Sequence, residues 1–384
     1  MSDFPTNVDV VVGLPSYNER DSIMSVTKVI DKGLKSYFKG QSALIVNIDS
    51  NSIDGTREVF SGVNTVTPKY VLNNKSEERG KGSNVQKLFE LFLQTNAKVL
   101  LLVDSDVVST APEWVRNLGW PIRDGYDHVF PAYMRSEYDA SITNHLCYPL
   151  LMGLFGADIE QPIAGEGAFS RRAVENFMDQ PWEGEVFKFG IDIFMTVTSV
   201  VGGMRLVKVP LGAKNHNPSE GKLNEMFYQV AESFFRQVGR HADIWRGERD
   251  YLEVPLEREE IKADSPHVTI DYKVLKGLAV QEFEKQVSFL RELFPGEVNE
   301  LVSMFAPNNV LNITKEMWLK YLFTVVDPDL SYSAGERAKI IRPLYFGRFL
   351  TFYKEALDLD HENSQKLIKE QARLFYEKRG EYIG

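Results

Sequence analysis

The chain of 384 residues contains a single cysteine, Cys147. One thiol cannot form an internal disulfide bond, so the fold must be stable without covalent cross-links. The sequence also shows no opening segment of positive charge followed by an apolar run, the pattern of a secretion signal. Together these features predict a protein of the reducing cytoplasm.

Long apolar runs and basic clusters are missing as well. The longest apolar-rich stretch, residues 146–157, contains Pro149 and two glycines, and it is about half as long as the ~20 residues that a membrane-spanning helix needs. The chain has 44 Lys and Arg against 54 Asp and Glu, a formal net charge of −10 at pH 7. We therefore expect no membrane span and no nucleic-acid partner, and a small molecule as the ligand.

The first third of the sequence alternates short apolar runs with segments of helical periodicity. Two helices are predicted at residues 21–37 and 82–94, because their apolar residues recur on one helical face. The runs that predict strands are residues 8–14, 43–49, 69–72, 98–103 and 127–130. This alternation is typical of an α/β fold, with a mostly parallel sheet covered by helices on both faces.

The remainder of the chain changes in character near residue 250. Before it, the pattern predicts a Gly-rich loop at 162–167, helices at 171–178 and 191–200, a strand at 204–211 and an amphipathic helix from 223 onward. Beyond it we predict helices alone, at residues 274–294, 314–323, 333–357 and 362–379. We expect one α/β domain over residues 1–250 and a helical region over 251–384 that buries its apolar stripes in a homodimer.

Two residues of the third tail helix carry specific expectations. Ser333 stands three residues before Glu336, which is the spacing of a capping box at a helix start. Pro343 lies inside the same segment and lacks a backbone N–H, so we expect it to kink or divide the helix.

Polar residues follow four of the predicted strands. The first strand runs into residues 15–19 (PSYNE), and the second ends at Asp49. The third leads to residues 79–82 (RGKG), and the fourth ends in residues 104–106 (DSD). The carboxyl ends of parallel strands share one edge of a sheet, where ligands of such folds bind. The four motifs therefore predict a nucleoside diphosphate site.

The DSD motif predicts a metal ion. A diphosphate leaving group carries about two negative charges, and a divalent cation held by a carboxylate can neutralise them. Asp106 is the expected metal ligand, whereas Asp104 is better placed for a ribose or a metal-bound water. Alone, the motif could simply end a strand in a turn, but the neighbouring motifs favour the metal.

The RGKG segment has two interpretations. Its glycines could let the backbone approach phosphate oxygens while Lys81 supplies positive charge, or it could be an ordinary loop before a helix. It lacks the spacing of a P-loop and of a dinucleotide-binding loop, which disfavours an ATPase and a dehydrogenase. Asp49 could accept a hydrogen bond from a uracil or guanine edge, or merely end its strand.

Together these motifs resemble the nucleotide-sugar half of GT-A glycosyltransferases. Residues 160–166 (EQPIAGE), 190–192 (GID) and the loop histidine His216 resemble more narrowly the mannosylglycerate and glucosyl-3-phosphoglycerate synthases. The resemblance extends from about residue 8 to about residue 235. It implies a GT-A fold and transfer, with retention of configuration, of glucose or mannose from a UDP- or GDP-sugar to D-glycerate or 3-phosphoglycerate, with Mg²⁺ or Mn²⁺.

The resemblance also implies roles for individual residues. The metal would be held by Asp106 and His216. The nucleotide and its phosphates would lie against Pro15, Tyr17, Glu19, Asp49, Lys81, Asp104 and Ser105. The acceptor would be bound by Arg135, Thr143, Ala164 and Gly165. The reacting centre would be lined by Ile163 and its carbonyl, by Asp192 on the sugar hydroxyls, and by Glu166.

Other interpretations of these residues stay open. His216 could be a surface residue, and Asp192 and Glu166 could be helix caps or buried partners of Arg171 and Arg172. Lys214 and Lys222 are candidates for binding a phosphorylated acceptor, or are solvated loop charges.

Departures from the pattern leave the choice of nucleotide and acceptor open. Tyr17 and residues 217–219 stand where the mannosylglycerate branch has a lysine and an aromatic residue. An inverting GT-A enzyme acting on a polyprenyl phosphate or polysaccharide would use Glu166 or Asp192 as its base. A sugar nucleotidyltransferase and an inactive binding module are further alternatives.

Overall fold

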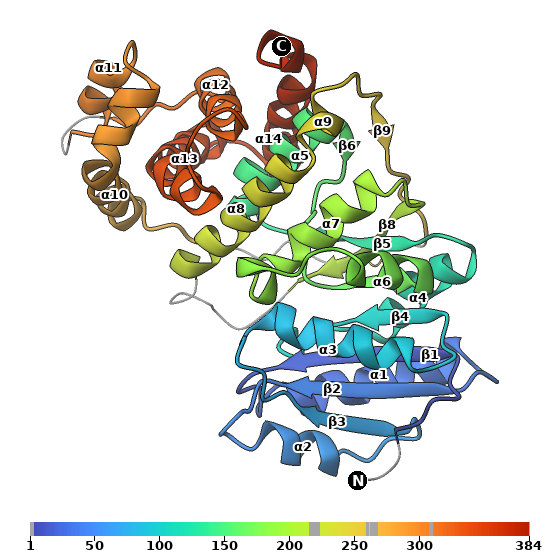
Figure 1. Ribbon diagram of the computed structural model, residues 1–384. Coiled ribbons are helices and arrows are strands. Elements are labelled where there is room, and N and C mark those ends of the chain that lie inside the picture. Colours follow the sequence, from blue (N-terminus) through green and yellow to red (C-terminus); the bar gives the residue numbers. More distant parts are fainter. Residues whose placement is uncertain (1–3, 215–222, 259–260, 262–267, 307–309, 384) are drawn as a thin grey trace. The chain divides into compact units, whose positions relative to one another are not determined.

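The computed structural model describes residues 4–214, 223–258, 261, 268–306 and 310–383 (Figure 1). Contacts within the chain define two compact units that interleave along the sequence. The first comprises residues 1–135, 161–230 and 254–266, and the second comprises 136–160, 231–253 and 267–384. The predicted division into an α/β domain of residues 1–250 and a helical region of residues 251–384 stays a prediction.

The first unit is built on a seven-stranded sheet. The strand order is β3-β2-β1-β4-β7-β5-β8. The strands are β1 (Val10–Ser16), β2 (Ala43–Asp49), β3 (Lys69–Asn73), β4 (Val99–Leu102), β5 (His128–Met134), β7 (Gly167–Ser170) and β8 (Leu206–Ala213). All neighbours pair in parallel except β7, which runs antiparallel to both β4 and β5. The predicted α/β fold with a mostly parallel sheet is confirmed.

Strand β7 is the one strand of this sheet that the sequence did not predict. The expected Gly-rich loop at 162–167 ends where β7 begins, at Gly167. The strand has four residues, and Gly167, Ala168 and Phe169 are all buried. A strand this short, enclosed on both faces, shows no alternation of polar and apolar residues, so periodicity cannot reveal it.

Helices cover both faces of this sheet. On one face α1 (Ile23–Tyr37) contacts α4 (Pro112–Arg123) and α2 (Thr56–Gly62). On the other face α3 (Lys81–Leu93) contacts β1, β2, α6 (Arg171–Met178) and α7 (Ile191–Val201). The sequence did not predict α2 or α4. Helix α4 begins with a proline, which suits a first helical position, but it contains a second, Pro121, inside the helix, where a proline argues against helical structure.

Helix α3 lies directly on strand β1. Gly13 is the contact point, because a Cβ there would lie 2.0 Å from Leu88 Cδ2. Leu88 itself is fully buried, as are Val85, Phe89 and Phe92 of the same helix. The absence of a side chain at Gly13 therefore lets α3 approach the sheet and fixes the start of the helix, at Lys81, beside the carboxyl ends of β1 and β4.

The second unit is mainly helical. Its elements are a π-helical segment (Thr143–Cys147), α5 (Tyr148–Phe155), the short strands β6 (Ala157–Asp158) and β9 (Leu252–Glu253), α9 (Ala242–Trp245), α10 (Tyr272–Leu293), α11 (Val298–Met304), α12 (Lys315–Val326), α13 (Ala334–Ala356), α14 (His361–Glu377) and a 3₁₀ turn (Arg379–Glu381). Helix α8 (Leu223–Arg240) begins in the first unit and ends in the second.

The apolar stretch noted in the sequence forms the centre of this second unit. All eight residues of α5 are buried, and the helix packs on α14. Their apolarity therefore reflects enclosure on every side by protein. Among the described residues, no helix is long and apolar enough to cross a membrane.

Helix α13 bears on both expectations about the tail. Ser333 and Glu336 form the predicted capping box, each side chain bonding the other residue's backbone N–H. The helix runs through Pro343 without division, and a kink at the proline stays a prediction. Residues 340–350 are all buried around the proline, and this packing offsets the loss of one backbone hydrogen bond.

Candidate active site

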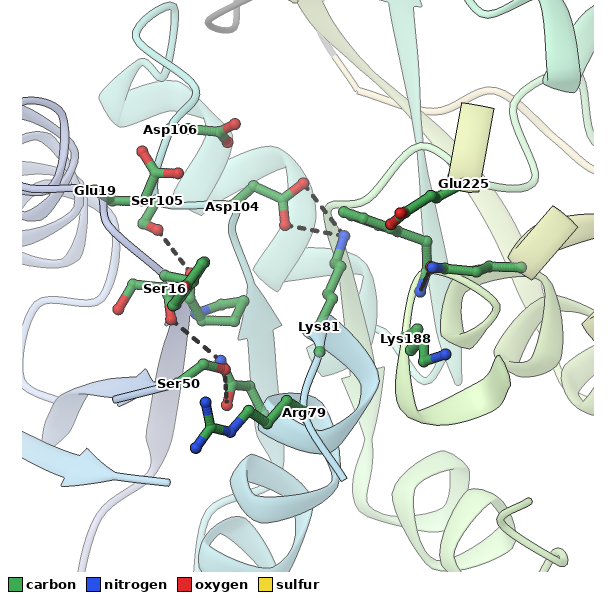
Figure 2. Close-up of a pocket in the computed structure, with 16 residues that line it drawn as sticks. Ser16, Glu19, Ser50, Arg79, Lys81, Asp104, Ser105, Asp106, Lys188 and Glu225 are labelled. Atoms are coloured by element: carbon green, nitrogen blue, oxygen red, sulfur yellow. Dashed lines mark hydrogen bonds and ion pairs between the residues drawn. The ribbon is translucent and has the colours of Figure 1, made fainter. Parts of the chain in front are cut away.

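A cavity of about 480 Å³ opens in the first unit at the carboxyl ends of β1, β2 and β4, beside the start of α3. Figure 2 shows its lining. The residues around it are Pro15, Ser16, Tyr17, Glu19, Ser50, Arg79, Gly80, Lys81, Asn84, Asp104, Ser105, Asp106, Lys188, Phe189, Glu225 and Gln229. A volume of this size is typical of small-molecule sites.

Seven residues expected to bind the nucleotide or metal line this cavity together: Pro15, Tyr17, Glu19, Lys81, Asp104, Ser105 and Asp106. They come from three different segments, so the fold brings them together. The ends of β1 and β4 are tied directly, since Ser105 Oγ donates to the Pro15 carbonyl at 2.7 Å. Tyr17 is half exposed at 54%, which leaves its ring accessible at the cavity wall.

Asp49 does not line the cavity. Its carboxylate is fully buried and accepts hydrogen bonds from Ser16 Oγ at 2.8 Å, from Ser52 N at 2.7 Å and from Ser52 Oγ at 2.6 Å. Arg57 Nε lies 3.4 Å from the same carboxylate. These bonds hold the ends of β1 and β2 in register, and contact with a base stays a prediction.

The glycines of the RGKG segment pack against the chain itself. A Cβ on Gly80 would lie 2.6 Å from the Phe187 carbonyl oxygen, and a Cβ on Gly82 would lie 1.8 Å from the Val186 carbonyl oxygen. Gly82 N also donates to the Lys188 carbonyl at 3.1 Å. Both glycines therefore allow residues 184–188 to pack closely against the start of α3.

Lys81 is the centre of a buried charge cluster. Its ammonium group lies 2.9 Å from Asp104 Oδ1 and 3.4 Å from Asp192 Oδ2, and it donates to the Gly165 carbonyl at 3.2 Å. Figure 2 shows this ammonium group reaching both carboxylate oxygens of Asp104. Because Asp192 stands in the first turn of α7, the contact joins the starts of two helices to the DSD motif.

A second lysine completes the cluster. Lys214 Nζ donates to Glu166 Oε2 at 2.7 Å and to the Ala164 carbonyl at 2.6 Å, and it lies 3.7 Å from Asp104 Oδ2. Tyr133 donates its hydroxyl hydrogen to Glu166 at 2.8 Å. The side chain of Lys214 is 8% exposed and that of Glu166 is 0% exposed, so the interpretation of Lys214 as a solvated loop charge is wrong.

The alternative pairing of these carboxylates with arginines is also wrong. Arg172 pairs with Asp127 at 2.9 Å. Arg171 donates to backbone carbonyls at the end of α3, among them that of Leu93. Glu166 and Asp192 instead pair with Lys214 and Lys81.

The charges in this cluster set each other's protonation. Burial acts to lower the pKa of Lys81, but the Asp104 and Asp192 carboxylates outweigh it and raise that pKa. Burial acts to raise the pKa of Asp104, yet the two lysines hold it below its usual value. For Asp192 and Glu166 burial prevails and raises the pKa of each. Burial and the neighbouring charges therefore act together on the pKa of Lys81, Asp104, Asp192 and Glu166.

Gly165 occupies the middle of this cluster. Its φ is +96°, and a Cβ there would lie 2.4 Å from Asp104 Oδ2 and 3.1 Å from both lysine Nζ atoms. No other residue type fits this backbone and this space. The loop 163–166 is thereby held against the DSD motif. Ile163 is partly exposed at its start, and Thr196 Oγ1 donates to the preceding Pro162 carbonyl at 2.6 Å.

The proposed metal ligands are only partly within the structure. Asp106 lines the cavity, whereas His216 lies outside the described residues. Among the described residues, no three His, Cys, Asp or Glu side chains are grouped as a metal cage. The carboxylate of Asp106 nonetheless suits Mg²⁺ or Mn²⁺, since such ions commonly bind through one or two carboxylates, substrate phosphates and water.

Two of the four expected acceptor residues, Arg135 and Thr143, fall in different units. Arg135 ends the first segment of the first unit, and Thr143 is buried at the start of the π-helical segment of the second unit. Between them Ala140 adopts a φ of +55°, a strained backbone conformation for a residue with a side chain. Each is described within its own unit, and their joint binding of an acceptor stays a prediction.

Several residues that line the cavity were not predicted from the sequence. Lys188 and Phe189 follow a 3₁₀ turn (Gly184–Phe187), and Glu225 and Gln229 stand in the first turns of α8. Their segments carry no phosphate or metal motif. The only hint in the sequence was the glycine on each side of Lys81. Two glycines at a helix start can mark close packing by another segment as well as a phosphate-binding loop.

Comparison with known proteins assigns the chain to a family. The model of the glycosyltransferase (GT) domain of mannosylglycerate synthase matches residues 6–236, which is more than half of the chain. The chain therefore belongs to this glycosyltransferase family. The match covers the sheet, the cavity and the charge cluster, and it agrees with the resemblance drawn from the motifs.

Individual relatives are more distant. Mannosylglycerate synthase of Selaginella moellendorffii is 26% identical over 200 residues, which are 50% of this chain and 44% of that protein. The chain thus spans less than half the length of this curated relative.

Among solved structures, glucosyl-3-phosphoglycerate synthase of Mycobacterium tuberculosis is similar. In complex with Mn²⁺, UDP-glucose and phosphoglyceric acid, it is 21% identical with a TM-score of 0.49, covering 60% of this chain and 79% of that chain. The same enzyme with Mn²⁺, UDP and glucosyl-3-phosphoglycerate is 22% identical, also with a TM-score of 0.49, covering 60% of this chain and 80% of that chain.

Proposed function

We propose that this protein transfers glucose or mannose from a UDP- or GDP-sugar to D-glycerate or 3-phosphoglycerate. The family assignment supports the reaction class. The observation that carries the proposal is the charge of the cavity. Four carboxylates line it, from Glu19, Asp104, Asp106 and Glu225, against the cations of Arg79, Lys81 and Lys188.

This charge balance argues for a metal-dependent donor. A diphosphate brings further negative charge into a cavity whose own carboxylates outnumber its cations. Binding is therefore unfavourable unless a divalent cation enters as well. Asp106 and His216 would hold Mg²⁺ or Mn²⁺, which when bound supplies electrostatic stabilisation of the departing diphosphate.

The residues of the chain then have distinct tasks. Lys81 places a buried positive charge beside the cavity, where developing negative charge on the leaving group would be stabilised. Pro15, Tyr17, Glu19 and Ser105 would bind the nucleotide, with Asp49 as a further candidate. Asp192 would accept hydrogen bonds from sugar hydroxyls. Asp104 and Glu166 would hold the two lysines in place, through their ion pairs with Lys81 and Lys214.

The acceptor would enter against the 163–166 loop. Arg135 and Thr143 would bind its carboxylate and orient its hydroxyl toward the anomeric carbon, with Ile163, Ala164 and Gly165 forming the wall. Retention of configuration is part of the proposal, and the hydroxyl proton would go to the leaving phosphate. An inverting enzyme would instead require an unpaired carboxylate base. Glu166 and Asp192 are both paired with lysines, which disfavours that alternative.

Two further parts of the proposal concern the protein in the cell. We place it in the cytoplasm, where nucleotide sugars and hydroxy acids are available, and we expect the helical tail to form a homodimer. Measurement of the oligomeric state by light scattering tests the second point, with a monomer at micromolar concentration as the contrary result.

The test of the function is a matrix of substrates. UDP-glucose, GDP-glucose and GDP-mannose are each combined with D-glycerate and 3-phosphoglycerate, with Mg²⁺ or Mn²⁺ and with EDTA. An α-linked glycoside, identified by anomeric NMR and absent with EDTA, is the expected product. A β-linked product would refute retention. Donor hydrolysis without any glycoside would refute the hydroxy-acid acceptor while keeping the sugar-nucleotide site.

A further inference from the structure

Lys214 and Glu166 form a deeply buried ion pair in the first unit. The side chains are 8% and 0% exposed, with Nζ 2.7 Å from Oε2. Neither residue is among those that line the cavity. The pair is nevertheless adjacent to it, because Lys214 also approaches Asp104 to 3.7 Å.

Two lysines share three carboxylates in this region. Lys81 faces Asp104 and Asp192, and Lys214 faces Glu166 and Asp104. The cluster thus carries one excess negative charge. If Lys214 were neutral, Lys81 alone would balance three buried carboxylates, and the cost of an unpaired buried charge would fall on the DSD motif.

The same lysines hold the backbone of the 163–166 loop. Lys214 binds the Ala164 carbonyl at 2.6 Å, and Lys81 binds the Gly165 carbonyl at 3.2 Å. Tyr133 fixes Glu166 from β5 through its hydroxyl group, at 2.8 Å. Lys214 follows β8 directly, which pairs with β5. The two groups that hold Glu166, Tyr133 and Lys214, therefore come from neighbouring strands.

We propose that Lys214 is a positioning residue whose charge neutralises Glu166, so that Lys81 stays on Asp104 and keeps the donor site in its binding geometry. This inference rests on the proposed function and deepens it. Glu166 is in this account the counterion of Lys214 and takes no proton from the acceptor. Lys214 acts through Asp104 and the loop, without contacting substrate.

The experiment is a double-variant cycle in the full chain. Lys214→Met removes the cation, Glu166→Gln removes the carboxylate, and the double variant removes both charges with little change in volume. We expect Lys214→Met to raise the donor KM by ~100-fold with acceptor KM unchanged, because breaking a buried pair leaves one charge unpaired. The double variant should recover to within ~10-fold of the wild type, because neither position of the former pair then holds an unpaired buried charge.

The pair Arg342 and Glu282 serves as a matched control. It is also buried, with side chains 5% and 11% exposed and a separation of 3.0 Å, and it belongs to the second unit. Arg342→Met should lower the midpoint of thermal unfolding as Lys214→Met does, while donor KM stays at the wild-type value. This comparison separates positioning of the donor site from loss of stability.

Three results would overturn the inference. One is a folded double variant as impaired as Lys214→Met, which would mean that Lys214 contacts a ligand or that Glu166 is a base. Another is an unchanged donor KM in Lys214→Met. The third is an equal rise of donor KM in Arg342→Met. Binding of UDP and GDP with Mn²⁺ by calorimetry tests the wild type independently, so failure of the proposed function appears as absent binding before any variant is made.

Discussion

Replacement of Gly82 by alanine sets two physical effects against each other. Gly82 is the second residue of α3, and alanine in a helix is normally favoured over glycine by about 1 kcal/mol. A Cβ at this position would, however, lie 1.8 Å from the Val186 carbonyl oxygen, whereas real Cβ contacts are essentially never under 3.0 Å. The two atoms must therefore separate by more than about 1 Å.

The backbone of 184–188 has to make this movement. Overpacking of this kind costs ~1–3 kcal/mol, which exceeds the gain in helix propensity. Because Lys188 and Phe189 line the cavity, we expect Gly82→Ala to unfold at a lower temperature and to raise the donor KM. If the whole cost of ~1–3 kcal/mol weakens donor binding, the donor KM rises about 5- to 150-fold.

Gly62→Ala is the matched control for this variant. Gly62 likewise lies at one end of a helix, as the last residue of α2, but a Cβ there would meet no atom within 4 Å. We expect its stability to be unchanged or slightly increased, with unchanged kinetics. Thermal unfolding and donor titration of both variants decide the matter. A Gly82→Ala protein as stable as Gly62→Ala, with wild-type donor KM, would refute the packing argument.

Three other predictions concern single residues. Asp106→Ala should abolish the difference in turnover between Mn²⁺ and EDTA, and metal-dependent activity in this variant would contradict the metal assignment. Arg135→Ala should raise the KM of the acceptor with donor binding unchanged by calorimetry, and unchanged acceptor kinetics would count against that role. Burial lowers the pKa of His128 to about 3 from an ordinary 6.5. The unfolded chain therefore binds a proton below pH 6.5 that the folded chain refuses until about pH 3, so stability falls as pH falls through this window, by up to ~1.4 kcal/mol per unit. His128→Gln should flatten the decline in a urea unfolding series from pH 7 to pH 4, and an identical slope in both proteins would contradict the cause.

Much of the fold could be predicted from the sequence because its strands are buried apolar runs. The runs beginning near Val10, Ala43 and Val99 are enclosed by helices on both faces, and such enclosure leaves a continuous apolar signal. Strand β7 and helix α4 were not predicted. The first is only four residues long, and the second carries prolines at its start and interior.

The candidate site divides in the same way. Asp104 and Asp106 come shortly after β4, and Lys81 lies in the connection that follows β3, so their convergence at one edge follows from the parallel arrangement of these strands. The role of Gly82 could not be predicted, because its neighbour Val186 is more than a hundred residues away in sequence. The pairing of Lys214 with Glu166 likewise depends on which strands become neighbours, and charge pairing across a sheet has no local sequence pattern.

The reversed direction of β7 also bears on how this chain can vary between species. Its pairing places Gly167 opposite Leu102, so the loop before β7 and the DSD motif after β4 leave the sheet at the same edge. Residues 136–160 leave the first unit and the chain returns to it at residue 161. The ladder fixes the point of return whatever the length of that excursion. The spacing from Gly165 to Ser170 should therefore be constant, whereas natural insertions and deletions between Arg135 and Gln161 should fall outside the buried helix α5.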